Sequence, residues 1–373
     1  MLWTSPEFDD HEQVCLFSDS ATGLRAIVAI HSTALGPAVG GTRFRYYGDD
    51  NLALDDALRL SRAMSYKSAL AGLPCGGGKS VIIGDPDQLK SKPLLHSYGR
   101  FINRLGSIFA TGEDVGMSLA DIETVRDISP FVGGTSSGAG DPSAHTAVGV
   151  LHGLRAVLEC RFQRDHFRGL SVSVQGLGAV GWDVATRLHA EGAHLTVADI
   201  RQENVDRAVA QFGAAVVSPD TIHQAEVDIY SPCALGGVIT EQSAKEIRAR
   251  AVAGAANNQL ASREAGEVLA ARGILFAPDY VINAGGIISG LEELFKMPGR
   301  NGSETAPLAM RLARIYDRLG EIFVRAASER RPPEAIAEQM ARELIARATT
   351  HWQIPETLDQ DRRRVPSQGR NRR

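Results

Sequence analysis

Two lysines and a run of glycines are the first residues in this sequence that could do chemistry. Lys79 follows three consecutive glycines, Gly76 to Gly78, in the segment LPCGGGK, and Lys67 stands 12 residues earlier. Glycines let bare backbone approach a small ligand closely, and a lysine adds a cation beside it. A nucleotide-triphosphate loop is excluded, because G-x-x-x-x-G-K-[ST] needs a glycine where Leu73 stands. We therefore predict a glycine turn that displays Lys79.

The surrounding segments indicate how these lysines would be held. The stretch LALDDALRLSRAMSYK has apolar residues near the helical period, so we predict a helix with Lys67 at its C-terminal end. A lysine there is often only a solvated partner of the helix dipole, and a glycine run can be only a turn. The short predicted strand SIFAT runs into Asp114. Strand ends beside a cleft are where α/β proteins place chemistry, so Asp114 is a candidate acid.

A second glycine motif lies in the other half of the chain. Gly176, Gly178 and Gly181 form G-x-G-x-x-G between a predicted strand and a predicted helix, and Asp199 ends the next predicted strand. In this context the glycines accommodate a pyrophosphate at a helix N-terminus, and the acid binds the adenosine ribose. An acid at this position favours NAD over NADP, although Arg201 could accept a 2′-phosphate.

Composition and charge restrict the class of protein. A chain of 373 residues with 43% hydrophobic and 23% charged residues is expected to form two globular domains. The net charge of −4 gives no electrostatic reason to expect binding to nucleic acid or to an anionic membrane. We find no secretion signal, no apolar run that could cross a bilayer and no metal-binding motif. The four cysteines are far apart and indicate reduced thiols in a cytoplasmic protein: Cys15, Cys75, Cys160 and Cys233.

Secondary-structure patterns differ along the chain. Residues 14–30 predict two strands around a turn at Thr22-Gly23, a helix is expected near 87–105, and the small residues of 133–143 resemble a linker. Alternating strands and helices follow, and the chain is helical from about 305. We predict that Asn257, Asn258 and Asn283 stand at strand ends and line a cofactor crevice, although asparagine is also a common turn former. The arginine-rich segment 351–373 is predicted to be disordered.

Seven blocks occur in an order that resembles a known family. They are GPAVGGTR, YKSALAGLPCGGGKSVIIGD, TGEDVG, QGLGAVG, SPCALGG, AGAANNQL and APDYVINAGG. From about Gly36 to Ala348 the sequence resembles the amino-acid dehydrogenases that act on glutamate, leucine, phenylalanine and valine, most closely the leucine and phenylalanine branch.

The resemblance implies a reversible oxidative deamination, in which an L-amino acid, NAD and water give a 2-oxo acid, ammonia and NADH. By position in its motif, Lys67 resembles the family lysine that binds the substrate carboxylate, and Lys79 the lysine that activates water. Asp114 resembles the acid that moves protons to and from the amine nitrogen. Two lysines close together in a desolvated cleft would lower each other's pKa towards the range of a general base.

The resemblance also implies an α/β fold of two domains with the active site between them. Residues 1–140 would form a mixed α/β substrate domain, and 144–325 a doubly wound, Rossmann-type NAD domain. Helices over 326–350 would pack back on the first domain, with hinges near 133–145 and near 325. A homo-oligomer is expected.

Further site residues follow from the same resemblance. Residues expected to contact the amino acid are Lys67, Val39, Gly40, Gly112, Asn258, Ile287 and Gly290. Residues expected to bind NAD are Gly176, Gly178, Ala179, Val180, Gly181, Asp199, Thr146, Cys233, Ala234, Asn257 and Asn283.

Substrate size is predicted from three of these positions. Glutamate-specific relatives bind the side-chain carboxylate with a lysine and a serine, where this chain has Val39 and Gly290. Leucine-selective members carry alanine and valine where Gly112 and Gly290 stand. We therefore expect glutamate to be a poor substrate and bulky aromatic or long aliphatic side chains to be tolerated, beside any activity on the branched-chain amino acids leucine and valine.

Two other functions compete with this hypothesis. The chain could be a catalytically inactive NAD-binding regulator, but Lys67, Lys79 and Asp114 are all present. It could instead be a 2-hydroxy-acid dehydrogenase, but that chemistry usually needs a His–Asp proton relay, and no histidine stands in a comparable motif.

Overall fold

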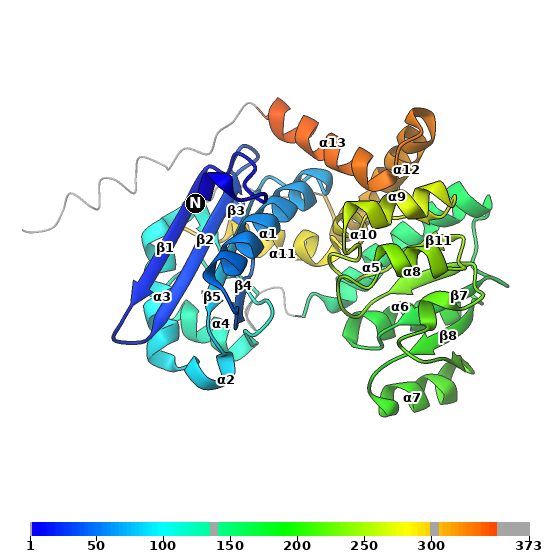
Figure 1. Cartoon of the computed structure of the whole chain (residues 1–373), viewed down its shortest axis with the longest axis horizontal. Coiled ribbons are helices and arrows are strands. Elements are labelled where there is room, and N and C mark those ends of the chain that lie inside the picture. Colours follow the sequence, from blue (N-terminus) through cyan, green and yellow to red (C-terminus); the bar gives the residue numbers. More distant parts are fainter. Residues whose placement is uncertain (1, 135–140, 299–305, 349–373) are drawn as a thin grey trace, which may run out of the picture.

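The chain builds two sheets in separate lobes (Figure 1). A computed structural model describes residues 2–134, 141–298 and 306–348. The first sheet has the order β1-β2-β5-β3-β6, with β4 also paired to β5. The β1–β2 hairpin turns at Gly23, as predicted, and the strands are antiparallel. Its strands are β1 (Gln13–Asp19), β2 (Leu24–Ser32), β3 (Ala38–Val39), β4 (Thr42–Arg45), β5 (Gly76–Ile83) and β6 (Phe109–Ala110).

The α-helices of the first lobe begin at side-chain caps. The Asp49 carboxylate accepts the Asn51 N–H at the start of the long helix that carries Lys67. The single helix predicted near 87–105 is in fact two, because Ser91 is extended and caps a new helix. The helices are η1 (Leu2–Thr4), α1 (Asp50–Leu70), α2 (Pro86–Leu89), α3 (Lys92–Leu105), η2 (Gly106–Ile108) and α4 (Leu119–Arg126).

The three glycines before Lys79 do not form the turn that the sequence predicted. They are the first residues of β5 and are buried. A Cβ on Gly77 would lie 2.0 Å from the backbone nitrogen of Ser65 in α1, and one on Gly78 would lie 2.7 Å from the Phe109 ring. The glycines therefore serve close packing of the strand against α1 and β6, which the local sequence could not reveal.

The second sheet is entirely parallel, in the order β12-β11-β10-β7-β8-β9. The order reverses between β7 and β10, and ligands of such sheets bind beyond the carboxyl ends of the strands at this point. The doubly wound fold predicted for this half is confirmed. Its strands are β7 (Ser171–Gln175), β8 (His194–Ala198), β9 (Ala215–Val216), β10 (Ile229–Pro232), β11 (Ala251–Val252) and β12 (Leu275–Phe276).

The remaining helices cover this sheet or lie between the lobes. Helix α10 contacts α1, and Figure 1 shows α10 and α11 between the two sheets. The helices are α5 (Ser143–Val157), the π-helical turn η3 (Leu158–Phe162), α6 (Ala179–Ala190), α7 (Gln202–Phe212), η4 (Ile222–Gln224), α8 (Glu241–Glu246), α9 (Arg263–Ala271), α10 (Asp279–Ile282), α11 (Gly285–Phe295), α12 (Leu308–Glu329) and α13 (Pro333–Arg347).

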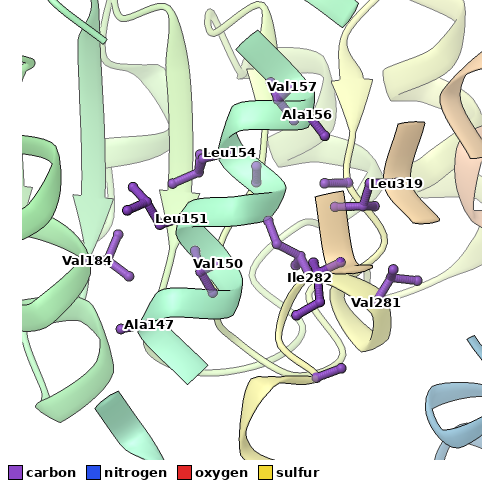
Figure 2. Packing of buried hydrophobic residues seen from close by; sticks show 14 of the residues in the cluster. Ala147, Val150, Leu151, Leu154, Ala156, Val157, Val184, Val281, Ile282 and Leu319 are labelled. Carbon is purple, nitrogen blue, oxygen red and sulfur yellow. The ribbon is translucent and has the colours of Figure 1, made fainter. Parts of the chain in front are cut away.

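Helix α5 lies at the centre of the largest hydrophobic core. Figure 2 shows Val150 and Leu154 of α5 among side chains from α6, α10 and α12, including Ile282 and Leu319. The same cluster continues to Leu70 at the end of α1. Burial of apolar surface therefore fixes the end of α1, with Lys67, against the second lobe.

The C-terminal helices contact both lobes. Helix α12 packs on α5, and α13 packs on α1. Arg342 of α13 forms an ion pair with Asp9 at 2.8 Å and lies over the Tyr66 ring. The predicted domain boundary, between residues 140 and 144, adjoins residues 135–140, which lie outside the described ranges. This boundary therefore stays a prediction. The segment 351–373 also lies outside them. Among the described helices, none is long and apolar enough to cross a membrane.

Candidate active site

Lys79 and Asp114 form a buried ion pair. Lys79 projects from β5 with its side chain 8% exposed, and its Nζ lies 2.7 Å from Oδ2 of Asp114. Asp114 belongs to the loop after β6, which is held to β4 by a bridge between Thr42 and Glu113. The structure thus brings together the lysine and the acid that the sequence predicted separately.

The charges of this pair are set by opposing effects. Burial lowers the pKa of Lys79, and the Asp114 carboxylate opposes that change. Burial alone would raise the pKa of Asp114, but Lys79 and Arg43 outweigh it and hold this pKa below its usual value. The carboxylate is therefore ionised at neutral pH, and the lysine loses its proton more readily than a lysine in water.

Arg43 was not predicted as a site residue. It lies on β4 and donates from Nε to Oδ2 of Asp114 at 3.1 Å and from Nη1 to Asp56 at 2.8 Å. The Tyr47 hydroxyl donates to the same Asp56 oxygen at 2.6 Å. This network fixes Asp114 relative to α1. The only signal for it in the sequence is the arginine that ends the GPAVGGTR block.

Lys67 faces the second lobe. Its Nζ donates to Oδ1 of Asn257 at 3.3 Å, and Asn283 donates to the same oxygen from Nδ2 at 2.7 Å. Burial lowers the pKa of Lys67 to about 8, with Asp279 opposing the change and nearby Lys79 adding to it. The three predicted residues Lys67, Asn257 and Asn283 therefore meet across the two lobes.

The predicted position of Asn283 in its element was wrong. It does not end a strand but stands between α10 and α11. Strand β12 stops at Phe276, and Pro278, which has no backbone N–H to donate, stands at the N-cap of the next helix, α10. Asn283 still reaches the crevice, because its Nδ2 also donates to the carbonyl of Ala255 after β11.

A cavity of about 530 Å³ lies beside the ion pair. Its wall adjoins the pair, because a Cβ on Gly41 would lie 3.0 Å from Cβ of Asp114. Five predicted substrate residues line it: Val39, Gly40, Gly112, Ile287 and Gly290. Asn258, Lys67, Lys79 and Asp114 are not among its described lining residues. Lining residues that were not predicted include Met64, Thr111, Leu119, Gly133, Ser289, Glu293 and Leu294.

The cavity has no cation among its described lining residues. Its carboxylates are Glu113, Asp141 and Glu293. Glu293 is already engaged, because its Oε2 accepts the backbone N–H of Gly134 at 2.9 Å and its Oε1 lies 3.3 Å from Arg126. An acidic ligand group in this cavity would therefore find carboxylates but no cation among the described lining residues.

The second glycine motif has the geometry of a dinucleotide site. Gly176 has a φ of +92°, and a Cβ there would lie 2.6 Å from Ala234. A Cβ on Gly181 would lie 2.0 Å from the carbonyl oxygen of Gly176, so helix and turn pack without room for a side chain. Gly178 has no atom within 4 Å of its Cβ position and precedes α6, which begins with Ala179 and Val180. The open space at this helix N-terminus suits a pyrophosphate.

Asp199 stands beside this space at the end of β8. Its Oδ2 accepts the Leu177 N–H at 2.6 Å, and its Oδ1 accepts the Arg201 N–H at 2.8 Å. Burial would raise its pKa, but the two backbone donors hold the pKa below its usual value. The side chain of Arg201 is 67% exposed. The carboxylate of Asp199 is held in place beside this space, whereas the Arg201 side chain extends into solvent, so Asp199 is the group positioned to bind a ribose.

The other predicted cofactor residues lie near the same edge of the sheet. Cys233 and Ala234 follow β10, and Thr146 lies in the first turns of α5. Asn283 is 6% exposed, and its buried Oδ1 has no hydrogen-bond partner in the described parts of the chain. Such an acceptor suits the amide of a nicotinamide. The residues present thus fit NAD.

Comparisons with known proteins identify the family. The Glu/Leu/Phe/Val dehydrogenase dimerisation domain matches residues 11–129, and the Glutamate/Leucine/Phenylalanine/Valine dehydrogenase domain matches residues 197–351. Leucine dehydrogenase of Geobacillus stearothermophilus is 43% identical, with 92% of this chain and 93% of the relative covered. Valine dehydrogenase of Streptomyces albus is 44% identical, with 91% of this chain and 93% of the relative covered.

A solved structure extends this similarity. L-tryptophan dehydrogenase from Nostoc punctiforme has a TM-score of 0.79 at 38% identity, with 91% of this chain and 97% of that chain covered. The predicted two-part α/β fold and the predicted family are therefore confirmed. On these matches, this chain belongs to the Glu/Leu/Phe/Val dehydrogenase family.

Proposed function

We propose that this chain catalyses the reversible, NAD-dependent oxidative deamination of a hydrophobic L-amino acid with a bulky side chain. Family membership establishes the reaction class, an NAD-dependent amino-acid dehydrogenase that acts on a CH–NH₂ donor. The observation that carries the proposal is the Lys79–Asp114 pair beside a cavity with no cation among its described lining residues.

Each polar residue has a role in this proposal. Lys67 binds the substrate carboxylate, because it is a cation at the cleft held by Asn257. Lys79, with its pKa lowered by burial, takes a proton from the attacking water and stabilises the carbinolamine oxygen. Asp114 moves a proton to and from the amine nitrogen. NAD, when bound, accepts the hydride from the substrate α-carbon.

Arg43 stabilises the charge of Asp114 during these proton transfers. It shares Oδ2 of Asp114 with Lys79, so the carboxylate keeps a cationic partner after Lys79 becomes neutral. The negative charge of Asp114 therefore remains stabilised through the step in which Lys79 is deprotonated.

The lining of the cavity supports a bulky hydrophobic substrate. Gly112, Gly133 and Gly290 contribute no side chains, while Met64 and Leu119 add apolar surface. Glutamate should be a poor substrate, because a buried carboxylate without a partner is costly and the described lining residues of the cavity include no cation. Selectivity among hydrophobic side chains should be graded, since one methylene of misfit costs only ~1–3 kcal/mol.

The cofactor is proposed to be NAD rather than NADP, because Asp199 is ionised and would repel a 2′-phosphate. The amino acid, its 2-oxo acid and ammonia are the expected small-molecule partners. We further propose that residues 1–140 with 326–350 and residues 144–325 form the two domains that close on them, with hinges near 133–145 and 325.

The oligomeric state and the cellular location are also part of the proposal. The match to a dimerisation domain supports a homo-oligomer, which light scattering would test. All four cysteines are free, which favours the reducing cytoplasm. Cell fractionation would test that location.

The test of the function is NAD reduction across the L-amino acids at alkaline pH, with the reverse reaction assayed with and without ammonia. We expect hydrophobic amino acids to be oxidised and the reductive reaction to need ammonia. No turnover with any amino acid would favour an inactive NAD-binding regulator. Reduction of 2-oxo acids without ammonia would favour a 2-hydroxy-acid dehydrogenase.

A further inference from the structure

We propose that Asp279 is a positioning residue for substrate binding. It holds the loop that carries Asn257 and Asn258, and its negative charge keeps Lys67 in the cationic form that a substrate carboxylate requires. The inference rests on the proposed function, because it takes Lys67 as the carboxylate-binding group. Asp279 is not among the site residues that the sequence predicted.

The Asp279 carboxylate is buried, and both of its oxygens accept hydrogen bonds from backbone N–H groups. It begins α10 and is 8% exposed. Its Oδ2 accepts the N–H of Gln259 at 2.7 Å, and its Oδ1 accepts the N–H of Tyr280 at 2.6 Å. An ionised carboxylate accepts at both oxygens without donating. Burial raises the pKa of Asp279, while the backbone donors and the charge of Lys67 oppose that change and favour the ionised form.

These bonds hold a loop in an unusual conformation. Asn258 has a φ of +51°, which residues other than glycine rarely adopt. Gln259 is fully buried, and its Nε2 donates to the carbonyls of Gly254 and Ala256 at 2.8 and 3.0 Å. The carboxylate of Asp279 thus fixes the loop from the side of α10. The loop in turn holds Asn257 at 3.3 Å from Nζ of Lys67.

Charge supplies the second half of the inference. The charged groups that act on Lys67 are Asp279 on α10, Lys79 on β5 and Asp114 after β6. Asp114 shares its charge with Lys79 and Arg43, which lie 2.7 and 3.1 Å from its Oδ2. Within the described ranges, no lysine or arginine forms an ion pair with Asp279. Asp279 is therefore the carboxylate that stabilises the charge of Lys67 most, and Asp114 adds to this effect.

The sign of the effect follows from these positions. Burial lowers the pKa of Lys67 to about 8, and Asp279 is the largest influence that opposes this change. Loss of the Asp279 charge lowers that pKa further, so Lys67 loses its proton at a lower pH. The NAD-bound enzyme should then begin to lose affinity for a carboxylate ligand at a lower pH than the wild type does.

Asp279→Asn tests the inference through a ligand that does not itself titrate. The probe is 3-phenylpropionate, a carboxylate without an amine, used as an inhibitor competitive with the amino acid at saturating NAD. Its Ki is measured from about pH 6.5 to 10, and it should weaken roughly tenfold per pH unit above the pKa of Lys67. We expect the midpoint of this loss to move to lower pH in Asp279→Asn. A loop effect alone would instead weaken binding equally at every pH.

Asp228→Asn is the matched control. Asp228 also receives backbone hydrogen bonds in the second lobe, since its Oδ2 accepts the N–H and hydroxyl of Ser171 at 2.9 Å. It precedes β10, at the edge of the sheet opposite the crevice. Its replacement should leave the midpoint of the Ki profile unchanged, whatever it does to thermal stability.

An unchanged midpoint in an Asp279→Asn protein that still binds NADH would overturn the inference. If that variant does not fold, Asp279→Glu replaces it, since this side chain keeps the charge and should keep the wild-type midpoint. A displaced midpoint in Asp279→Glu would then overturn the inference. A wild-type enzyme that turns over no hydrophobic amino acid would instead refute the proposed function, so the two failures are distinguishable.

Discussion

Replacing Gly290 with valine should move the substrate preference from large to small side chains. Gly290 lies within α11 and lines the cavity, and no atom stands within 4 Å of its Cβ position. The valine side chain therefore enters open space and takes it from the substrate. Each methylene of misfit costs about 1–3 kcal/mol, or roughly 10–200-fold in kcat/KM. The three added carbons should lower the phenylalanine-to-valine ratio of kcat/KM by at least about tenfold.

The fold should tolerate this change. Glycine inside a helix is about 1 kcal/mol less favourable than alanine, so a residue with a side chain does not weaken the helix here. Gly320→Val in α12 is the matched control, because Gly320 also has no atom within 4 Å of its Cβ position but does not line the cavity.

The assay is initial-rate NAD reduction with phenylalanine and with valine for wild type and both variants. The ratio should fall in Gly290→Val and stay at the wild-type value in Gly320→Val. If the ratio is unchanged in Gly290→Val, Gly290 does not contact the substrate and the assignment of the cavity is wrong.

Four further predictions concern the lysine–acid pair, the cofactor and the buried strand. Lys79→Ala should bind NAD nearly normally and lose about 10²–10⁴-fold in turnover, and a variant that keeps most of its turnover would remove Lys79 from the mechanism. Asp114→Asn should lose turnover similarly. The Asp114 carboxylate raises the pKa of Lys79, so without it the residual kcat should increase with pH over a lower pH range than in the wild type. An increase over the same pH range as in the wild type would contradict this electrostatic link. Asp199→Ala should weaken NAD binding in a titration and relax discrimination against NADP, with little change in the amino-acid KM; a wild-type preference for NADP would point to Arg201 instead. Gly77→Ala should lower the free energy of unfolding in urea by roughly 1–3 kcal/mol, because its Cβ would lie 2.0 Å from backbone of α1, and an unchanged urea midpoint would show that strand and helix separate easily.

Patterns local in the chain were predicted well from the sequence. The strand, glycine motif, helix and acid of the dinucleotide site lie within residues 171–199, and each has a short-range signature. The β1–β2 hairpin and the helix ending near Lys67 follow from turn chemistry and helical periodicity. The candidate roles of Lys67, Lys79 and Asp114 came from a family resemblance carried by contiguous motifs.

Contacts between distant segments were decided by the tertiary structure alone. The glycines before Lys79 extend a strand instead of turning, because α1 packs on them. Arg43 meets Asp114, Lys67 meets Asn257, and Gln259 meets Asp279 through elements that only packing brings together. A sequence pattern indicates the period and the ends of a single helix or strand, but it does not indicate which other helix or strand packs against it. The apolar burial that brings α1 against the second lobe supplies that information, and with it the charges that set the pKa of Lys67.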